Sequence, residues 1–165
     1  MKLHLILLLI VFDSCAQNVE NTITLIPAKH IGPVCINLNV KDGLPKEYEN
    51  ENRVYRIGKE GLLNTQFQAI YGQYQFNKYY YENENGQRQE IKFLNVYDEQ
   101  KKLDLDSIYI FGVGQTGTGE GFDEHGTFLT APRILFYVGK YEDTEKKAHE
   151  QMQFGFKNQK IIGRK

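Results

Sequence analysis

The segment Ser107-Ile-Tyr-Ile-Phe-Gly-Val-Gly114 is the strongest apolar run of the chain outside its N-terminus. Short runs that are rich in β-branched and aromatic residues predict buried strands. The segment 133–139, RILFYVG, has the same character and predicts a second buried strand. The stretch between the two is rich in glycine, so it predicts a long, flexible connection that continues to about residue 131. The core of the domain is therefore expected around these two strands.

Two further strands are predicted near the start of the domain, at 22–27 and 33–40. In the second, apolar residues alternate with Cys35, Asn37 and Asn39. A period of two is typical of a strand with one buried and one exposed face. We therefore expect this strand to be half-buried.

Two hairpins are predicted in the middle of the chain. In the first, the short apolar segments 54–57 and 62–67 are separated by four residues with a glycine at each end. In the second, the segments 74–82 and 87–96 flank a turn that contains Asn85-Gly86. Tight hairpin turns need residues that accept a positive φ, and Asn-Gly supplies them. The second prediction has the stronger turn signal.

One helix is predicted near the C-terminus, where the residues 143–154 contain neither Gly nor Pro. Asp143 or Thr144 could cap it, and Ala148 and Met152 would share one face. The composition of the whole chain favours strands, because it contains 11 Tyr and 10 Phe. The sequence therefore predicts a mainly β fold: an antiparallel, sandwich-like single domain with one C-terminal helix.

The first fifteen residues, MKLHLILLLIVFDSC, have the plan of a secretory signal. A basic residue precedes a short apolar run, which is about half the roughly 20 residues that a membrane-spanning helix needs. A cysteine directly after a small residue predicts a lipoprotein signal at 1–14 with lipid attachment at Cys15. The alternative is a plain secretory signal, because Asp13 is unusual at such a cleavage site. The segment 15–22 then reads as a tether, and 23–165 as one β-rich domain.

The chain has two cysteines, Cys15 and Cys35. Acylation of Cys15 would leave Cys35 without a disulfide partner, so we expect a small, partly buried thiol there. The chain has 20 basic and 21 acidic side chains. This balance gives no electrostatic reason to expect nucleic-acid binding.

The segment from Ile26 to Leu94 resembles a family of uncharacterised bacterial exported domains, many of them lipoproteins. One departure from its pattern is Gly58, where a proline is expected. The family implies a secreted or lipid-anchored β-rich domain, and it implies no catalytic residues. The matching pieces are Ile26-Pro27, Gly32-Pro33-Val34, Asp42-Gly43, Arg53–Ile57, Gly61–Thr65, Tyr71-Gly72 and the tyrosine-rich strand before Asn85-Gly86, with Phe136–Gly139 as a later match.

The glycine-rich stretch carries two candidate chemistries. Its segment 112–117 matches the pattern of a dinucleotide-binding loop, but the residues after it cannot sustain the helix that this motif requires. A cluster of acids and an imidazole follows, and it could bind a divalent metal or perform acid–base chemistry. Several glycines loosen this stretch, so a solvated acidic loop is the favoured interpretation, and no metal site or cofactor is predicted. The cluster consists of Glu120, Asp123, Glu124 and His125.

The tyrosines suggest a binding surface. In the strand containing Tyr79, Tyr80 and Tyr81, alternation places the first and last on one side and Tyr80 on the other. Exposed aromatic rings, here also those of Tyr71 and Tyr74, would suit a glycan or a partner protein of the envelope.

The leading functional hypothesis is a non-enzymatic binding or structural module, lipid-anchored in the bacterial cell envelope. No acidic run follows Cys15, so the periplasm-facing side is favoured over the cell surface. The alternative is a secreted hydrolase-type enzyme that uses the acidic and histidine residues at 120–125.

Overall fold

The computed structural model describes residues 20–72, 76–95 and 103–164. Within them, nine strands form a large sheet in the order β3-β4-β1-β6-β7-β8-β11-β2-β5, and three form a small sheet in the order β12-β10-β9. The elements are β1 (Thr22–Pro27), β2 (Gly32–Asn37), β3 (Glu47–Glu49), β4 (Asn52–Arg56), β5 (Leu62–Asn64), β6 (Asn77–Glu82), β7 (Arg88–Phe93), β8 (Tyr109–Thr116), β9 (Gly119–Asp123), β10 (Gly126–Thr130), β11 (Arg133–Gly139), α1 (Asp143–Lys146), α2 (Ala148–Lys157) and β12 (Ile161–Arg164).

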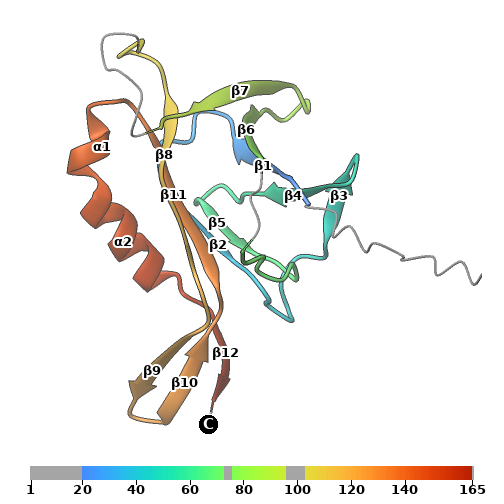
Figure 1. Ribbon diagram of the computed structural model, residues 1–165, viewed down its shortest axis with the longest axis vertical. Helices are drawn as coiled ribbons and strands as arrows, with labels where there is room; N and C mark the ends of the chain where they lie inside the picture. The colour runs from blue at the N-terminus through green and yellow to red at the C-terminus, as the bar shows by residue number, and fades with distance from the viewer. Residues whose placement is uncertain (1–19, 73–75, 96–102, 165) are drawn as a thin grey trace, which may run out of the picture.

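The large sheet curls, so that the half β3-β4-β1-β6-β7 faces the half β8-β11-β2-β5 across the core (Figure 1). Six of the ten described strand pairs are antiparallel, so the predicted mainly β, sandwich-like fold is confirmed. The sheet is nevertheless mixed, since β1 runs parallel to both of its neighbours, β4 and β6. These three strands therefore begin at the same edge of the sheet, which is the one formed by strand ends and not by an outermost strand.

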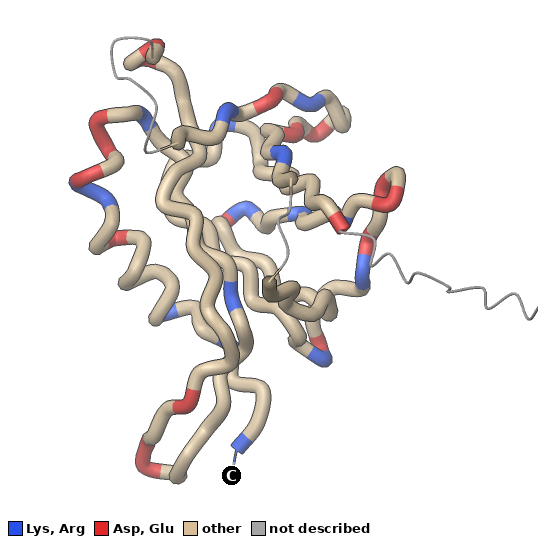
Figure 2. The backbone as a smooth tube through the Cα atoms, viewed as in Figure 1, with Lys and Arg blue, Asp and Glu red and all other residues tan. Residues whose placement is uncertain are grey.

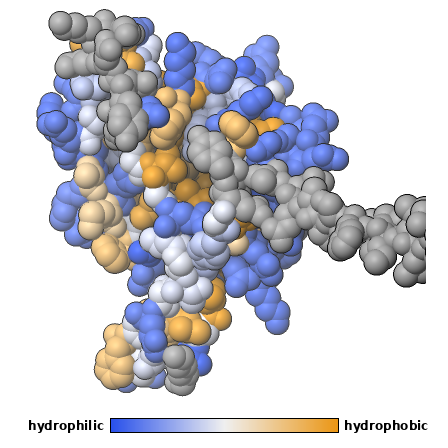
Figure 3. Space-filling view, in the orientation of Figure 1, coloured by the Kyte–Doolittle hydropathy of each residue, from blue (hydrophilic) through white to orange (hydrophobic). Residues whose placement is uncertain are grey.

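The main core lies between the two halves. It draws residues from both, among them Ile26 of β1, Ile36 of β2 and Ile110 of β8. Phe67, which follows β5, and Phe136 of β11 are its largest fully buried side chains. Apolar surface is visible between β8 and β11 on one side and β1 and β6 on the other (Figure 3).

The first predicted hairpin is wrong. β4 pairs with β1 and β3, whereas β5 pairs with β2 in parallel, so the two segments belong to opposite ends of the large sheet. The glycine-flanked turn does form, because the Gly61 N–H donates to the Gly58 carbonyl oxygen at 3.0 Å. The Gly61 carbonyl oxygen, however, accepts from the Cys35 N–H at 2.9 Å, which directs the chain to β2.

The second predicted hairpin is confirmed as β6–β7. Gly86 has a φ of +74°. The Asn83 carboxamide oxygen accepts hydrogen bonds from the N–H groups of Asn85 and Gln87. The hairpin therefore closes through the turn chemistry that the sequence indicates.

Strand β2 is buried on both faces and not on one. Cys35 and Asn37, which should have faced solvent, have exposed fractions of 0%. Helix α2 packs over this face of β2 and β11 (Figure 1). The Asn37 carboxamide donates both to Asn64 Oδ1 and to the Asn158 carbonyl oxygen, each at 2.9 Å. Cys35 and Asn37, two of the residues predicted to face solvent, thus lie in a second interface, which α2 covers.

The predicted helix is confirmed as α1 and α2, and the face that it turns to the sheet is not the one that carries Ala148 and Met152. Met152 is 54% exposed, whereas Gly155 is buried against the sheet. A Cβ at Gly155 would lie 2.7 Å from Leu135 Cδ1, so the absence of a side chain lets α2 approach β11 closely. A contact that the backbone makes at a glycine involves no apolar side chain, so the hydrophobic pattern of the sequence does not predict it.

The predicted flexible connection between the two core strands is also wrong. β8 continues to Thr116, and the following residues form the hairpin β9–β10, which pairs with β12. This small sheet projects from the body as an arm (Figure 1). A Cβ at Gly121 would lie 2.4 Å from the Phe128 ring, so the phenylalanine covers the glycine that lowered the strand propensity.

Alkaline pH is expected to destabilise this fold. Burial raises the pKa of the Cys35 thiol from 9.0 to about 11, and those of Tyr79 and Tyr81 from 10.0 to about 12. A raised pKa means that the contribution of each group is fully present below its ordinary value and is lost as the pH rises through the higher one. The free energy of unfolding in urea should therefore fall between about pH 9 and 12. Cys35→Ala should reduce the early part of this fall, and an equal fall in both proteins would contradict the role of the thiol.

Candidate functional site

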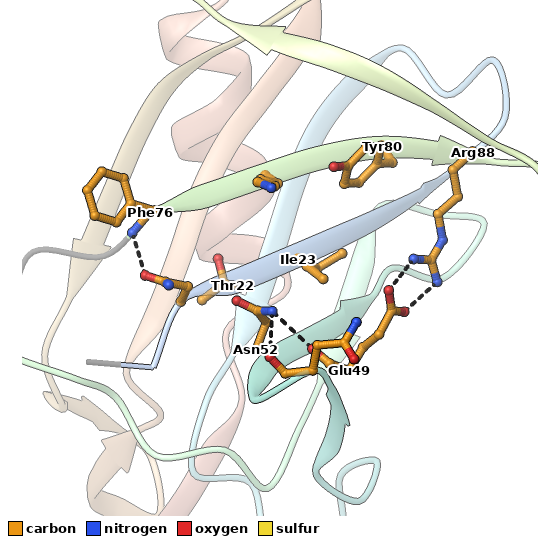
Figure 4. A pocket seen from close by; sticks show the side chains of 10 residues that line it. Thr22, Ile23, Glu49, Asn52, Phe76, Tyr80 and Arg88 are labelled. Atoms are coloured by element: carbon orange, nitrogen blue, oxygen red, sulfur yellow. Dashed lines mark hydrogen bonds and ion pairs between the residues drawn. The ribbon is translucent and has the colours of Figure 1, made fainter. Parts of the chain in front are cut away.

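A groove lies on the face of β3-β4-β1-β6-β7 that turns away from the main core. Its volume is about 400 Å³. Figure 4 shows that its walls come from the start of β1, the β3–β4 turn, β6 and β7. It is lined by Asn21, Thr22, Ile23, Glu49, Asn50, Asn52, Phe76, Lys78, Tyr80 and Arg88.

The floor of the groove is apolar. Ile23 and Leu25 of β1 and Val54 of β4 form a small buried cluster, and Tyr80 of β6 packs against it. The predicted alternation of the tyrosines is therefore confirmed, since Tyr79 is buried in the main core on the opposite face of β6. Tyr80 offers its ring to the groove.

An ion-pair chain closes one end of the groove. Arg88 donates to both carboxylate oxygens of Glu49 at 2.9 Å, and its Nε lies 3.2 Å from Glu82 Oε1. Arg56 continues the chain, because it pairs with Glu82 and, at 2.9 Å, with Glu47. Acidic and basic residues consequently alternate over β3, β4, β6 and β7 (Figure 2). The β3–β4 turn is held over the apolar floor.

The electrostatics of the groove follow from these pairs. The hydrogen bond from Arg88 lowers the pKa of Glu49, and the same bond raises the pKa of Arg88. Both groups therefore stay charged and engaged with each other at neutral pH. Lys78 has no ion-pair partner among the residues that the structure describes. It is the cation of the groove that a ligand could neutralise.

Carboxamides and an aromatic ring complete the lining. The Asn52 carboxamide donates to the carbonyl oxygens of Glu49 and Asn50, each at 3.0 Å, and so fixes the β3–β4 turn. Asn21 accepts a hydrogen bond from the Phe76 N–H at 3.2 Å (Figure 4). The Phe76 ring is 66% exposed.

The lining combines apolar, amide and charged groups. It includes no His, Cys or Ser, and its one carboxylate, Glu49, is held by Arg88. An apolar floor with a few oriented polar groups is the usual composition of a ligand site.

The predicted acidic and histidine cluster lies elsewhere, in the β9–β10 hairpin. Asp123 binds Arg164 of β12 through both carboxylate oxygens, at 2.9 and 3.0 Å, and this bond lowers its pKa. Glu124 and His125 lie at the turn, with side chains that are 85% and 68% exposed. Glu120 stands opposite Leu129 on the neighbouring strand, away from the turn. Within residues 20–72, 76–95 and 103–164, no three His, Cys, Asp or Glu side chains are grouped to hold a metal ion.

The sequence also singles out two cysteines and two further tyrosines. Cys35 is a free, buried thiol. Tyr71 is 59% exposed, whereas Cys15 and Tyr74 lie outside the described residues. None of the helices in the described part of the chain has the length and apolar character needed to cross a bilayer.

Sequence reasoning missed the groove itself. Its residues come from four separate segments, and no local spacing connects Asn21, Glu49 and Arg88. The one usable signal was the alternation of the tyrosines, which predicts that Tyr80 is directed away from the main core.

The chain is similar to one protein family and to a solved structure. Residues 18–134 match a protein family described as a family of unknown function, DUF6843. No curated protein matches the chain. Among solved structures, the chain is similar to a "Putative Lipoprotein from Bacillus anthracis", with 20% identity, a TM-score of 0.49, and coverage of 85% of this chain and 96% of that one. This structural likeness is too weak to carry an argument about function. The family match includes the segment Ile26–Leu94 and extends over more than half of the sequence, and the chain therefore belongs to the DUF6843 family of unknown function.

Proposed function

We propose that this protein is a lipoprotein of the bacterial cell envelope, acylated at Cys15, that serves as a non-enzymatic binding module. The observation that carries the binding role is the groove, which combines an apolar floor, carboxamides and one unpaired cation. The lipid attachment is supported by the sequence of the first fifteen residues.

The ligand that fits this lining is an acidic glycan. Sugar rings present apolar faces that pack against aromatic rings such as that of Tyr80. Sugar hydroxyl groups exchange hydrogen bonds with carboxamides, which both donate and accept. A carboxylate on the sugar would form a charge-assisted bond with Lys78.

Cys15→Ala tests the attachment. The variant should no longer incorporate labelled fatty acid and should leave the membrane fraction, because the acylated thiol is removed. Cys35→Ala is the matched control and should keep both the label and the membrane association. Fatty-acid labelling that survives Cys15→Ala would overturn the proposed anchor.

Lys78→Gln tests the binding role. Calorimetric titration with an acidic disaccharide should show an affinity about tenfold weaker than that of the unaltered protein, since a charge-assisted hydrogen bond of about 1.5 kcal/mol is lost. Lys41→Gln removes an exposed lysine that does not line the groove, and it should leave the affinity unchanged. Equal affinities for the two variants would exclude Lys78 from the site.

A further inference from the structure

The described chain is fixed to the domain from its first residue. The Glu20 carboxylate forms an ion pair with Arg53, whose side chain is only 10% exposed. Arg53 also donates to the Gln68 carbonyl oxygen at 2.6 Å, and its guanidinium lies 4.9 Å from the centre of the Phe67 ring. The Thr22 N–H then donates to the Phe76 carbonyl oxygen at 3.1 Å. Glu20 to Thr22, part of the predicted tether, therefore already bond to the fold.

This fixation limits the distance between the domain and Cys15. Five peptide units separate Cys15 from Glu20, and a fully extended chain of that length spans about 18 Å at most. The limit depends on bond geometry alone and holds for any conformation of those residues. This step rests on the proposed acylation of Cys15. The edge of the sheet at which β1 begins, next to Glu20, must therefore stay close to the membrane surface.

The residues at this edge have the chemistry of a lipid interface. The parallel strands β1, β4 and β6 all begin here, and Phe76 immediately precedes β6. The Phe76 ring is 66% exposed and points away from Glu49 and Arg88 (Figure 4). Tyr48 is 49% exposed, and its hydroxyl donates to Glu20 at 3.4 Å. Tyr48 has one apolar and one polar end, as do the aromatic side chains that are enriched at the membrane–water boundary. Exposed phenylalanine rings are among the apolar groups that enter the region between headgroups and acyl chains.

We propose that this edge is a membrane-contact surface, with the Phe76 ring inserted at the boundary between lipid headgroups and acyl chains. Its partner is a phospholipid surface. The acyl chains on Cys15 supply the attachment, while Phe76 and Tyr48 fix the orientation of the domain. The groove then opens beside the membrane, and α2 lies on the opposite side of the molecule (Figure 1).

The absence of tryptophan from the chain permits a direct test. Phe76→Trp places a single fluorophore at the proposed contact. Phe156→Trp is the matched control, because Phe156 is similarly exposed, at 55%, but lies in α2 on the other half of the sheet. Each variant of the full chain is expressed in a bacterium that exports and lipidates lipoproteins, purified in detergent without selection for the lipid, and reconstituted into phosphatidylcholine vesicles with and without brominated acyl chains.

Bromine quenches tryptophan only at close range. The fluorescence of Phe76→Trp should fall strongly in brominated vesicles, and that of Phe156→Trp should stay nearly unchanged. Equal quenching of the two variants, or stronger quenching of Phe156→Trp, would overturn the proposed orientation. Circular dichroism of each variant establishes that it is folded.

Flotation separates this inference from the proposed function. Protein that fails to float with the vesicles contradicts the lipid anchor itself. Protein that floats, but in which neither fluorophore is quenched, keeps the anchor and contradicts the contact at Phe76. A quenched Phe76→Trp whose Lys78→Gln derivative binds the acidic disaccharide about tenfold more weakly would support both.

Discussion

Phe67→Ala is expected to lower the free energy of unfolding by about 3–5 kcal/mol, because it leaves a cavity in the core. The Phe67 side chain is 1% exposed. Tyr48 and Tyr55 contact the ring edge-on, with centroid distances of 5.2 and 5.5 Å. The ring also supports the guanidinium of Arg53, so its removal loosens the ion pair with Glu20. Urea denaturation followed by circular dichroism measures the loss.

Phe122→Ala is the matched control for this prediction. Phe122 lies on β9 of the projecting arm and is 80% exposed. Its removal should change the free energy of unfolding by no more than about 0.5 kcal/mol. Comparable losses in the two variants would mean that Phe67 does not occupy a packed core.

Gly61→Ala is expected to cost about 3 kcal/mol, which combines backbone strain with a steric clash. Gly61 has a φ of +77°, which a residue with a Cβ adopts only under strain. The added Cβ would lie 2.5 Å from the Pro33 carbonyl oxygen and 3.0 Å from His30 Cε1. The Pro33 carbonyl belongs to β2, which pairs on both sides, so it cannot move without disturbing the sheet. The same denaturation experiment measures the effect.

Gly86→Ala separates the two causes. Gly86 has nearly the same φ, +74°, but no atom lies within 4 Å of its added Cβ. This variant should therefore cost only the strain, about 1 kcal/mol. If Gly61→Ala cost no more than Gly86→Ala, the close approach of the turn to β2 would be refuted.

These two glycines also show what the sequence predicts and what it leaves open. Both glycine-containing turns form, because turn chemistry is local. Asn83 and Gly86 join two strands that then pair with each other. The turn ending at Gly61 joins strands that pair elsewhere. Which strand a segment pairs with depends on contacts distant in sequence, and residue type near the turn does not encode it.

The contact between α2 and β11 and the position of the groove could not be predicted from the sequence, for related reasons. Met152 is apolar and Gly155 is not a core residue by type, yet the glycine makes the close contact with Leu135. In the same way, Glu49 and Arg88 are charged residues of two separate segments, and the tertiary fold brings them together. The content of Tyr and Phe and the alternation of apolar residues predicted a mainly β fold, whereas the groove is formed by tertiary contacts.

The position of β1 has a mechanical consequence. β1 is an interior strand of the large sheet, hydrogen-bonded to β4 on one side and to β6 on the other. Any tension that reaches Glu20 along the chain pulls parallel to these strands and loads the rows of hydrogen bonds together, in shear. An edge strand would instead be peeled off one bond at a time. The strand order thus makes the N-terminus of this domain a point from which it can be held against force.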